Sequence, residues 1–426
     1  MGQINIESKK SWLMWLMAVA FFAFQFVLRL YPGLVMPEIM GKFQVDATSF
    51  GVLSAAYYLG YAGMQIPVGI LLDRYNPRLV ISGAALTCAI GTLSFVYADH
   101  WNLTLFGRFL VGVGSAAGFL GTAKTIRIAF PEKKFTTLMG LTFTLGLSGA
   151  LYGGKPVSLL IQQFGWIPVL KILALISFVI AACIFIFFPR TTTQTQAAVQ
   201  PSNSELMGSL KLILGNNKII WLGVAGALLV GPLESFADVW GVSYLVNVYG
   251  IAKPEASLIT SCIYLGMLLG GPLLSYIAEK TQAHYLINSI CGLFMAAIFI
   301  LVMTTNIASS QPLLMGLMTT VGVLCCYQAV VFAIACRLAP PHLSGLATSV
   351  TNCINMFGGC VLHFAMGWVM DQRWQGELEN GIKVYDSTSY TLAIAVIPAT
   401  LVLGFIVFLV LKRGDETPPQ NLVKNS

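Results

Sequence analysis

The sequence is poor in charge, and this scarcity excludes most kinds of soluble protein. Of its 426 residues, 10% are charged and 57% are hydrophobic, whereas a soluble domain is about 25% charged. The chain contains no HExxH, GxSxG or P-loop pattern, so we expect neither an enzyme nor a pump driven by ATP. Its nine cysteines all lie inside apolar runs, which argues against a disulfide framework and a zinc site. We therefore expect no metal or cofactor.

Long apolar runs are abundant instead, and their length predicts a polytopic membrane protein. A helix needs about 20 apolar residues to cross the roughly 30 Å hydrocarbon layer, and the mean hydropathy of the chain is +0.78. Counting such runs predicts an all-α protein with twelve transmembrane helices. They lie near residues 12–35, 48–70, 79–98, 103–125, 137–159, 167–188, 219–245, 256–277, 284–305, 312–335, 344–370 and 390–411.

The distribution of the 24 Lys and Arg residues predicts which end of the molecule faces the cytoplasm. Cytoplasmic loops of membrane proteins carry an excess of these residues. If both termini are cytoplasmic, only Lys42, Lys253, Arg373 and Lys383 lie outside, and five more lie within or at the ends of spans. The remaining fifteen are then cytoplasmic: Lys9, Lys10, Arg74, Arg78, Arg127, Lys133, Lys134, Arg190, Lys211, Lys218, Lys280, Arg337, Lys412, Arg413 and Lys424. The net charge of +7 thus reports topology, and no nucleic-acid partner is expected.

The chain divides into two similar halves. Residues 189–218 are rich in Thr, Gln, Ser and Asn and predict a cytoplasmic linker between six-helix bundles at 1–188 and 219–411, with a cytoplasmic tail at 412–426. Residues 58–60 and 264–266 both read YLG, 206 positions apart, and Asp73-Arg74 aligns with Glu279-Lys280 at the same offset. This internal repeat predicts two pseudo-symmetric bundles.

Three motifs resemble those of the major facilitator superfamily. Residues 69–78, GILLDRYNPR, are similar to its G-x-L-x-D-R-x-G-R-R/K loop, and residues 108–116, RFLVGVGSA, are similar to its R-x-x-Q-G-x-G-x-A motif with Val111 in place of Gln. Residues 149–154, GALYGG, are close to the G-P-x-x-G-G pattern of its antiporters, but Ala150 replaces the proline, which argues against an antiporter. The segments 28–40 and 49–74 resemble a bacterial branch of amino-acid and nutrient importers that includes phagosomal transporters.

Charged residues at the cytoplasmic ends of spans two and eight are candidate gating residues. Asp73 can accept hydrogen bonds from Arg74, Arg78 or a neighbouring helix end, which would lock the halves together while the cavity faces outward. Glu279 and Lys280 repeat the pair in the second half. The alternative is that these residues only report topology.

Ionisable residues inside the spans are candidate site residues, because burying each in a membrane costs at least about 2.5 kcal/mol. Arg29 lies seventeen residues into the first span, roughly 25 Å from its cytoplasmic end. Glu234 lies at a similar depth in span seven, with Asp238 four residues later. The resemblance to the superfamily implies that spans one and seven face each other across the central cavity, so we expect Arg29 to face Glu234 across the seam between the halves. The i, i+4 spacing of Glu234 and Asp238 predicts that they share one helix face and couple protons. The alternatives are that an Arg29–Glu234 salt bridge only holds the closed state, or that Asp238 lies near enough to the outer surface to be solvated.

Further polar residues complete the predicted substrate site. Arg108 matches the superfamily motif and is expected in the cavity, whereas Lys155 and Lys171 are expected to extend to the interface. The first half is then cationic and the second acidic, which suits a zwitterion. The neutral candidates for substrate contact are Tyr57, Tyr61, Gln328 and Asn352, although ordinary interhelical hydrogen bonds would also explain them.

These observations predict a secondary transporter of the bacterial inner membrane. We expect a monomer in the lipid bilayer that imports a small amino-acid-like zwitterion together with protons by alternating access. Export of a metabolite or siderophore is an alternative. A sensor that keeps the transporter fold without net transport is another, although the predicted linker and tail offer it little room for a signalling module.

Overall fold

The computed structural model describes residues 9–190, 203–305, 307, 310–379 and 381–416, and within them the chain is almost entirely helical. Eleven helical segments are long and apolar enough to span a membrane, and the bent pair Asn217–Leu228 and Gly231–Tyr249 makes a twelfth. The prediction of twelve transmembrane helices is confirmed.

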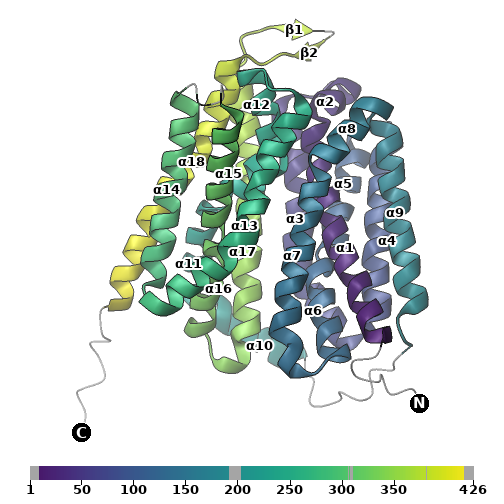
Figure 1. Ribbon diagram of the computed structural model, residues 1–426, viewed down its shortest axis with the longest axis vertical. Helices are drawn as coiled ribbons and strands as arrows, with labels where there is room; N and C mark the ends of the chain where they lie inside the picture. The colour runs from purple at the N-terminus through teal and green to yellow at the C-terminus, as the bar shows by residue number, and fades with distance from the viewer. Residues whose placement is uncertain (1–8, 191–202, 306, 308–309, 380, 417–426) are drawn as a thin grey trace.

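The first six spans form the half drawn in purple to blue in Figure 1. They comprise α1 (Lys9–Leu34), α3 (Ala47–Arg74), α4 (Pro77–Val96), α5 with α6 (Trp101–Ser115 and Ala117–Ala129), α7 with α8 (Phe135–Gly153 and Lys155–Phe164) and α9 (Trp166–Phe187). A short helix α2 (Met36–Phe43) joins α1 to α3, and a 3₁₀ turn, η1 (Glu132–Lys134), precedes α7.

The second six spans form the half drawn in green to yellow. They comprise α11, η3 and α12 (Asn217–Leu228, Gly231–Trp240 and Gly241–Tyr249), α13 (Lys253–Thr281), α14 (His284–Thr304), α15 with α16 (Gln311–Cys325 and Tyr327–Leu338), α17 (Ser344–Gln372) and α18 (Ser387–Glu416). Helix α10 (Asn203–Leu214) precedes them, the 3₁₀ turn η5 (Pro341–Leu343) leads into α17, and a hairpin of β1 (Leu378–Glu379) and β2 (Ile382–Lys383) follows it.

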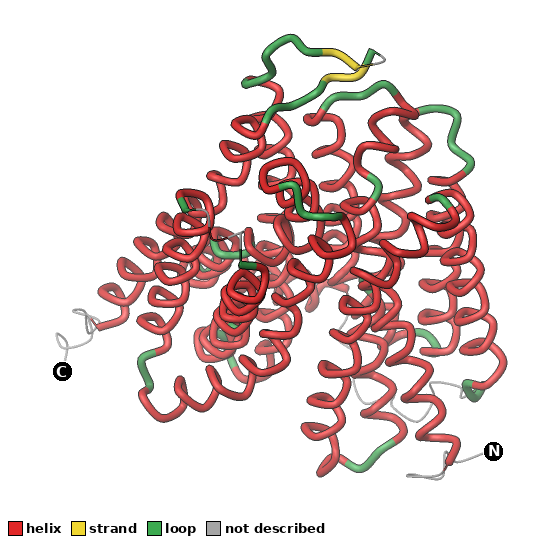
Figure 2. Tube along the Cα trace, turned by 45° about the horizontal axis from the view of Figure 1, so that its top comes forward, coloured by secondary structure: helices red, strands yellow, loops and turns green. Residues whose placement is uncertain are grey.

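The two halves meet along two seams and at the centre. Helix α3 packs along α17 at one seam, α7 and α8 pack on α13 at the other, and α1 meets η3 between them. Figure 2 shows the halves close together near the hairpin and diverging toward the end that carries both termini. We call the hairpin end the outer end and the opposite end the terminal end.

Local sequence explains two features that position the site. A Cβ atom added to Gly149 of α7 would collide with the backbone oxygen of Ala23, so glycine permits the close approach of α7 to α1. Span seven is interrupted after Leu228, and residues Gly231–Trp240 continue as a π-helix whose ten residues are all buried. Such wide turns are rare and frequently lie at functional sites.

Candidate functional site

A buried ion pair joins the two halves where α1 meets η3. Nε of Arg29, on α1, donates to Oδ2 of Asp238, on η3. The side chains are 7% and 0% exposed. Two opposite charges withdrawn from water require mutual pairing and further hydrogen bonds to be stable. One guanidinium nitrogen, Nη2 of Arg29, lacks a partner among the described residues and could receive another acceptor.

The partner of Arg29 differs from the prediction. We expected Glu234, but the structure pairs Arg29 with Asp238, and the alternative that Asp238 is solvated at the surface is wrong because this residue is 2% exposed. Counting residues gives the depth along a helix but not the rotation about its axis, which decides which of the two carboxyl groups meets Arg29. Glu234 turns toward α17 instead, where its Oε2 lies 2.5 Å from the position that a Cβ of Gly359 would occupy.

Glu234 is the least satisfied carboxyl group of the site. It is 0% exposed, and neither of its oxygens has a hydrogen-bond partner among the described residues. An unpaired charge in such surroundings is costly, so a carboxyl group placed here is suited to gaining and losing a proton as its surroundings change.

Two tyrosines, one from each half, bind the carboxylate of Asp238. The hydroxyl of Tyr58, on α3, lies within hydrogen-bond reach of Oδ2 and also 3.0 Å from the backbone oxygen of Glu234. The hydroxyl of Tyr264, on α13, donates to Oδ1. Sequence reasoning did not assign these tyrosines to the site, although they are the repeat-related pair at an offset of 206. The signal that could have identified them is that both repeat-related positions carry a polar side chain inside a span.

Arg108 supports the site from the first half. Its guanidinium donates to the backbone oxygens of Leu28 at 2.6 Å and Arg29 at 2.8 Å, and its carbon atom Cζ lies 4.5 Å from the ring centre of Tyr57. The hydroxyl of Tyr57 donates to Gln25 at 2.9 Å, and Tyr61 stacks on Tyr57 at 6.0 Å. The arginine therefore binds the stretch of α1 that carries Arg29.

Comparison with known proteins identifies the family. Residues 13–362 match the model of the Major Facilitator Superfamily. The chain belongs to this superfamily. It is therefore a multi-pass membrane protein and a secondary transporter rather than an enzyme.

Individual members of the superfamily are only distantly similar. The chain is 24% identical over 419 residues to the uncharacterized transporter YybO of Bacillus subtilis (strain 168), covering 89% of this chain and 88% of that protein. It is 23% identical over 377 residues to the probable galactarate/D-glucarate transporter GarP of Escherichia coli (strain K12), covering 79% and 82%. A solved structure of a bacterial homologue of the human lysosomal transporter Spinster, inward-facing and occupied, superposes with a TM-score of 0.71 at 16% identity over 95% and 98% of the chains. The last comparison bears on the fold alone.

The remaining predicted substrate residues, Gln328 of α16 and Asn352 of α17, are half-buried. Nε2 of Gln328 lacks a hydrogen-bond partner within the described part of the chain. Within the described residues, neither is a hydrogen-bond or ion-pair partner of Arg29 or Asp238, and their role stays a prediction.

The predicted gating residues lie at the terminal end of this superfamily member. Asp73 accepts a hydrogen bond from Lys124 of α6 at 2.8 Å, within the first half, and Arg78 is buried over the ring of Phe185 at 4.1 Å. Arg74 is the last residue of α3, and Glu279 and Lys280 are exposed near the end of α13. The lock is predicted for the state in which the terminal end is closed. The structure described here does not test it, and it stays a prediction.

Ion pairs between the halves lie at the outer end. Lys253 pairs with Glu38 at 3.0 Å, Lys155 pairs with Glu255 at 3.0 Å, and Lys383 pairs with Asp46 at 3.5 Å. Lys155, which we expected to extend to the interface, therefore joins α8 to α13. These pairs close the end that lies opposite the termini.

Proposed function

We propose that this transporter carries a small organic acid, and that a carboxylate of the solute binds Arg29 in exchange for Asp238. The buried Arg29–Asp238 pair carries the proposal, because it is a cation at the meeting point of the halves whose present partner is itself a carboxylate. A second carboxylate can occupy the same position with the same chemistry, and arginine suits it because its planar donors match two carboxylate oxygens. The unpartnered Nη2 of Arg29 offers the first point of contact.

Displacement of Asp238 would couple binding to movement. Tyr58 and Tyr264 hold this carboxylate from opposite halves, so a solute that separates Asp238 from Arg29 also changes the contacts that join α3 and α13 to η3. A ligand shifts a conformational equilibrium only by binding the two states differently. Exchange of one carboxylate for another provides that difference, and the halves then open alternately at the two ends.

Glu234 is the proposed proton carrier, with Asp238 as its partner in coupling. Glu234 is buried beside the pair, its carboxyl oxygens accept no hydrogen bond from the residues that the structure describes, and a charge in this position is unfavourable. When Asp238 leaves Arg29, the local balance of charge changes, and uptake of a proton by either carboxyl group restores it. The solute and the proton would then move in the same direction.

The distant relatives favour an acid over the amino acid that we predicted from the sequence. GarP is named for galactarate and D-glucarate, which are sugar acids, and no relative reported above is named for an amino acid. A zwitterion remains the second candidate, because its amine could bind the unpartnered Glu234 while its carboxylate binds Arg29. Import into the cytoplasm, with both termini cytoplasmic and a monomer in the inner membrane, is our proposed arrangement. Export and a sensor without net transport are the alternatives.

The test is uptake by purified protein in liposomes, with an imposed pH gradient and labelled sugar acids, aromatic acids and amino acids. We expect an acid to accumulate against its gradient, the wild-type rate to depend on the pH gradient, and Arg29→Gln to abolish uptake while Lys171→Gln does not. Arg29→Lys keeps the charge and serves as the folded comparison. Accumulation of neutral or zwitterionic solutes alone would refute the acid. Binding without transport would favour the sensor.

A further inference from the structure

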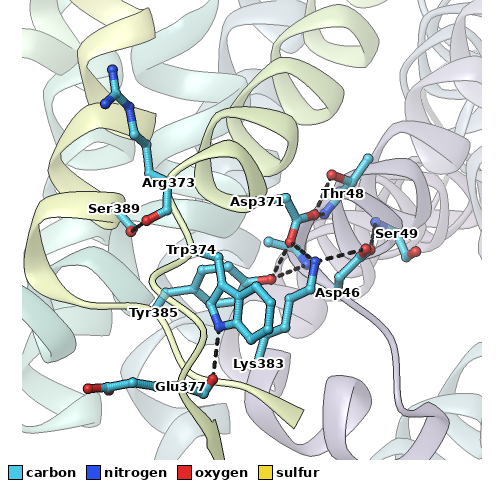
Figure 3. Close-up of polar contacts among 11 residues, drawn as sticks. Asp46, Thr48, Ser49, Asp371, Arg373, Trp374, Glu377, Lys383, Tyr385 and Ser389 are labelled. Atoms are coloured by element: carbon cyan, nitrogen blue, oxygen red, sulfur yellow. Dashed lines mark hydrogen bonds and ion pairs between the residues drawn. The ribbon is translucent and has the colours of Figure 1, made fainter.

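One carboxylate of the second half reaches the first turn of a helix in the first half. Asp371, near the end of α17, accepts a hydrogen bond from the backbone amide of Thr48 at 2.7 Å, and the Thr48 hydroxyl also donates to it. Figure 3 shows Asp371 between Thr48 on one side and Lys383 on the other. The contact spans 323 residues of sequence and crosses the α3–α17 seam at the outer end.

A tyrosine completes the contact. The hydroxyl of Tyr385 donates to Oδ1 of Asp371 at 2.6 Å and accepts a hydrogen bond from the backbone amide of Ala47 at 3.0 Å. The amide of Ser49 binds Asp46, the N-cap residue of the same helix, at 2.9 Å. The first amides of a helix have no partner within the helix. In α3 two of them are therefore satisfied by the opposite half of the protein.

Lys383 ties this arrangement to the β-hairpin. Its Nζ donates to Asp371 at 2.9 Å and to Asp46 at 3.5 Å, so one ammonium group lies between carboxylates of both halves. Burial lowers the pKa of Lys383, but the hydrogen bond to Asp371 and the charges of both carboxylates outweigh it and raise the pKa above its ordinary value. The ammonium group consequently stays charged over the physiological range.

The side chain of Asp371 is better shielded from water than those of the Lys155–Glu255 ion pair between the halves. It is 10% exposed, whereas the side chains of Lys155 and Glu255 are 34% and 37% exposed. Exposed pairs contribute little to stability, and a carboxylate that accepts several hydrogen bonds contributes more. The hydrogen bonds of Asp371 should therefore stabilise this end more than the Lys155–Glu255 pair does.

We propose that the connection between α17 and α18 is an outer latch, which caps α3 from the opposite half and must release before the halves can part at the outer end. The latch comprises Asp371, Lys383 and Tyr385, and its receptor is the first turn of α3. The inference rests on the alternating access of the proposed function, but not on the identity of the solute. Release breaks the hydrogen bonds of Thr48 to Asp371 and of Ala47 to Tyr385 together with the Lys383–Asp46 ion pair, so the latch favours the state described here.

Hydrogen exchange of the full chain in liposomes, without solute, tests the latch. We expect Asp371→Ala to raise exchange of the amides at the start of α3 about fivefold, the usual effect of a lost cap. Opening of the outer end would also raise exchange in the first turn of α13 at the other seam, which simple fraying of α3 would not do. Asp371→Asn keeps an acceptor for Thr48 but loses the charge, and we expect an intermediate effect.

Asp386→Ala is the matched control, because Asp386 follows the same hairpin but accepts hydrogen bonds from Ser389 of its own helix, α18. It should raise exchange in α18 and leave α3 and α13 unchanged. Lys383→Gln is the milder variant if Asp371→Ala does not fold. It should raise hydrogen exchange at the start of α3 and in the first turn of α13 by a smaller factor. Unchanged exchange at the start of α3 in the folded Asp371 or Lys383 variants, or an increase confined to α3, would overturn the latch. Because no solute is present, failure of the acid proposal leaves this test intact.

Discussion

Removing one charge of the Arg29–Asp238 pair should lower the free energy of unfolding more than removing both charges. Asp238→Asn leaves the guanidinium of Arg29 buried and uncompensated, and such a change typically costs about 3–5 kcal/mol. Arg29→Gln leaves Asp238 with its two tyrosine hydroxyls, Tyr58 and Tyr264, which still donate to it. Because hydrogen bonds to a charged group contribute about 1.5–3 kcal/mol each, we expect Arg29→Gln to cost less than Asp238→Asn.

The double variant Arg29→Gln/Asp238→Asn separates stability from transport. It removes both charges of the pair, so its loss of stability should fall below the sum of the single losses by about 0.5–3 kcal/mol, the range measured for residues in contact. Transport of an organic acid should remain absent. The assay is unfolding of the purified protein in detergent, followed by uptake in liposomes.

The exposed pair Lys155–Glu255 provides the control cycle, in which we expect a coupling of about 0–1 kcal/mol. Its side chains are 34% and 37% exposed, against 7% and 0% for the central pair. Additive losses at the central pair, or uptake by the uncharged double variant, would refute the reasoning.

Three further predictions concern single residues. Glu234→Gln should abolish uptake driven by a pH gradient while sparing exchange of solute across the membrane, and persistent proton-driven uptake would exclude Glu234 as the carrier. Asp73→Asn should leave the protein folded but reduce transport severely, as measured by uptake at equal protein content, and a near-normal rate would argue against the gate. Hydrogen bonds from Ser389 lower the pKa of Asp386, so the start of α18 should be protected above about pH 4, the value of a free aspartate, and lose protection as the pH falls through the lower folded pKa. Hydrogen exchange between pH 3 and 6 measures this, and protection that does not depend on pH would contradict it.

The sequence was sufficient to predict the fold because span length, the distribution of basic residues and the internal repeat all act on scales of twenty residues or more. It also placed Arg29, Glu234 and Asp238 near the seam, since depth along a helix follows from counting residues. It could not identify the partner of Arg29, because that depends on how α1 and η3 are rotated about their axes, which counting residues does not determine. The structure accordingly pairs Arg29 with Asp238 and not with Glu234.

The outer latch was beyond sequence reasoning for a different reason. Lys383 and Asp371 were visible only as charges near a span end, and Tyr385 was one aromatic residue among many. Their meeting with Thr48 depends on how two distant segments pack at one end of the molecule. Such a contact requires knowledge of the seam between the halves, which hydrophobic length does not supply.

The internal repeat has a consequence for the symmetry of the central site. Two identical halves would contribute the same groups to that site, since the axis between them runs along the membrane normal and a half-turn about it exchanges one half with the other. Asp238 removes this equivalence, because the residue 206 positions earlier, in the first half, is Pro32. Both tyrosines of the repeated YLG segments consequently bind an acid that only one half possesses. The two halves of a doubled scaffold can therefore take on different chemical roles at one site through very few substitutions.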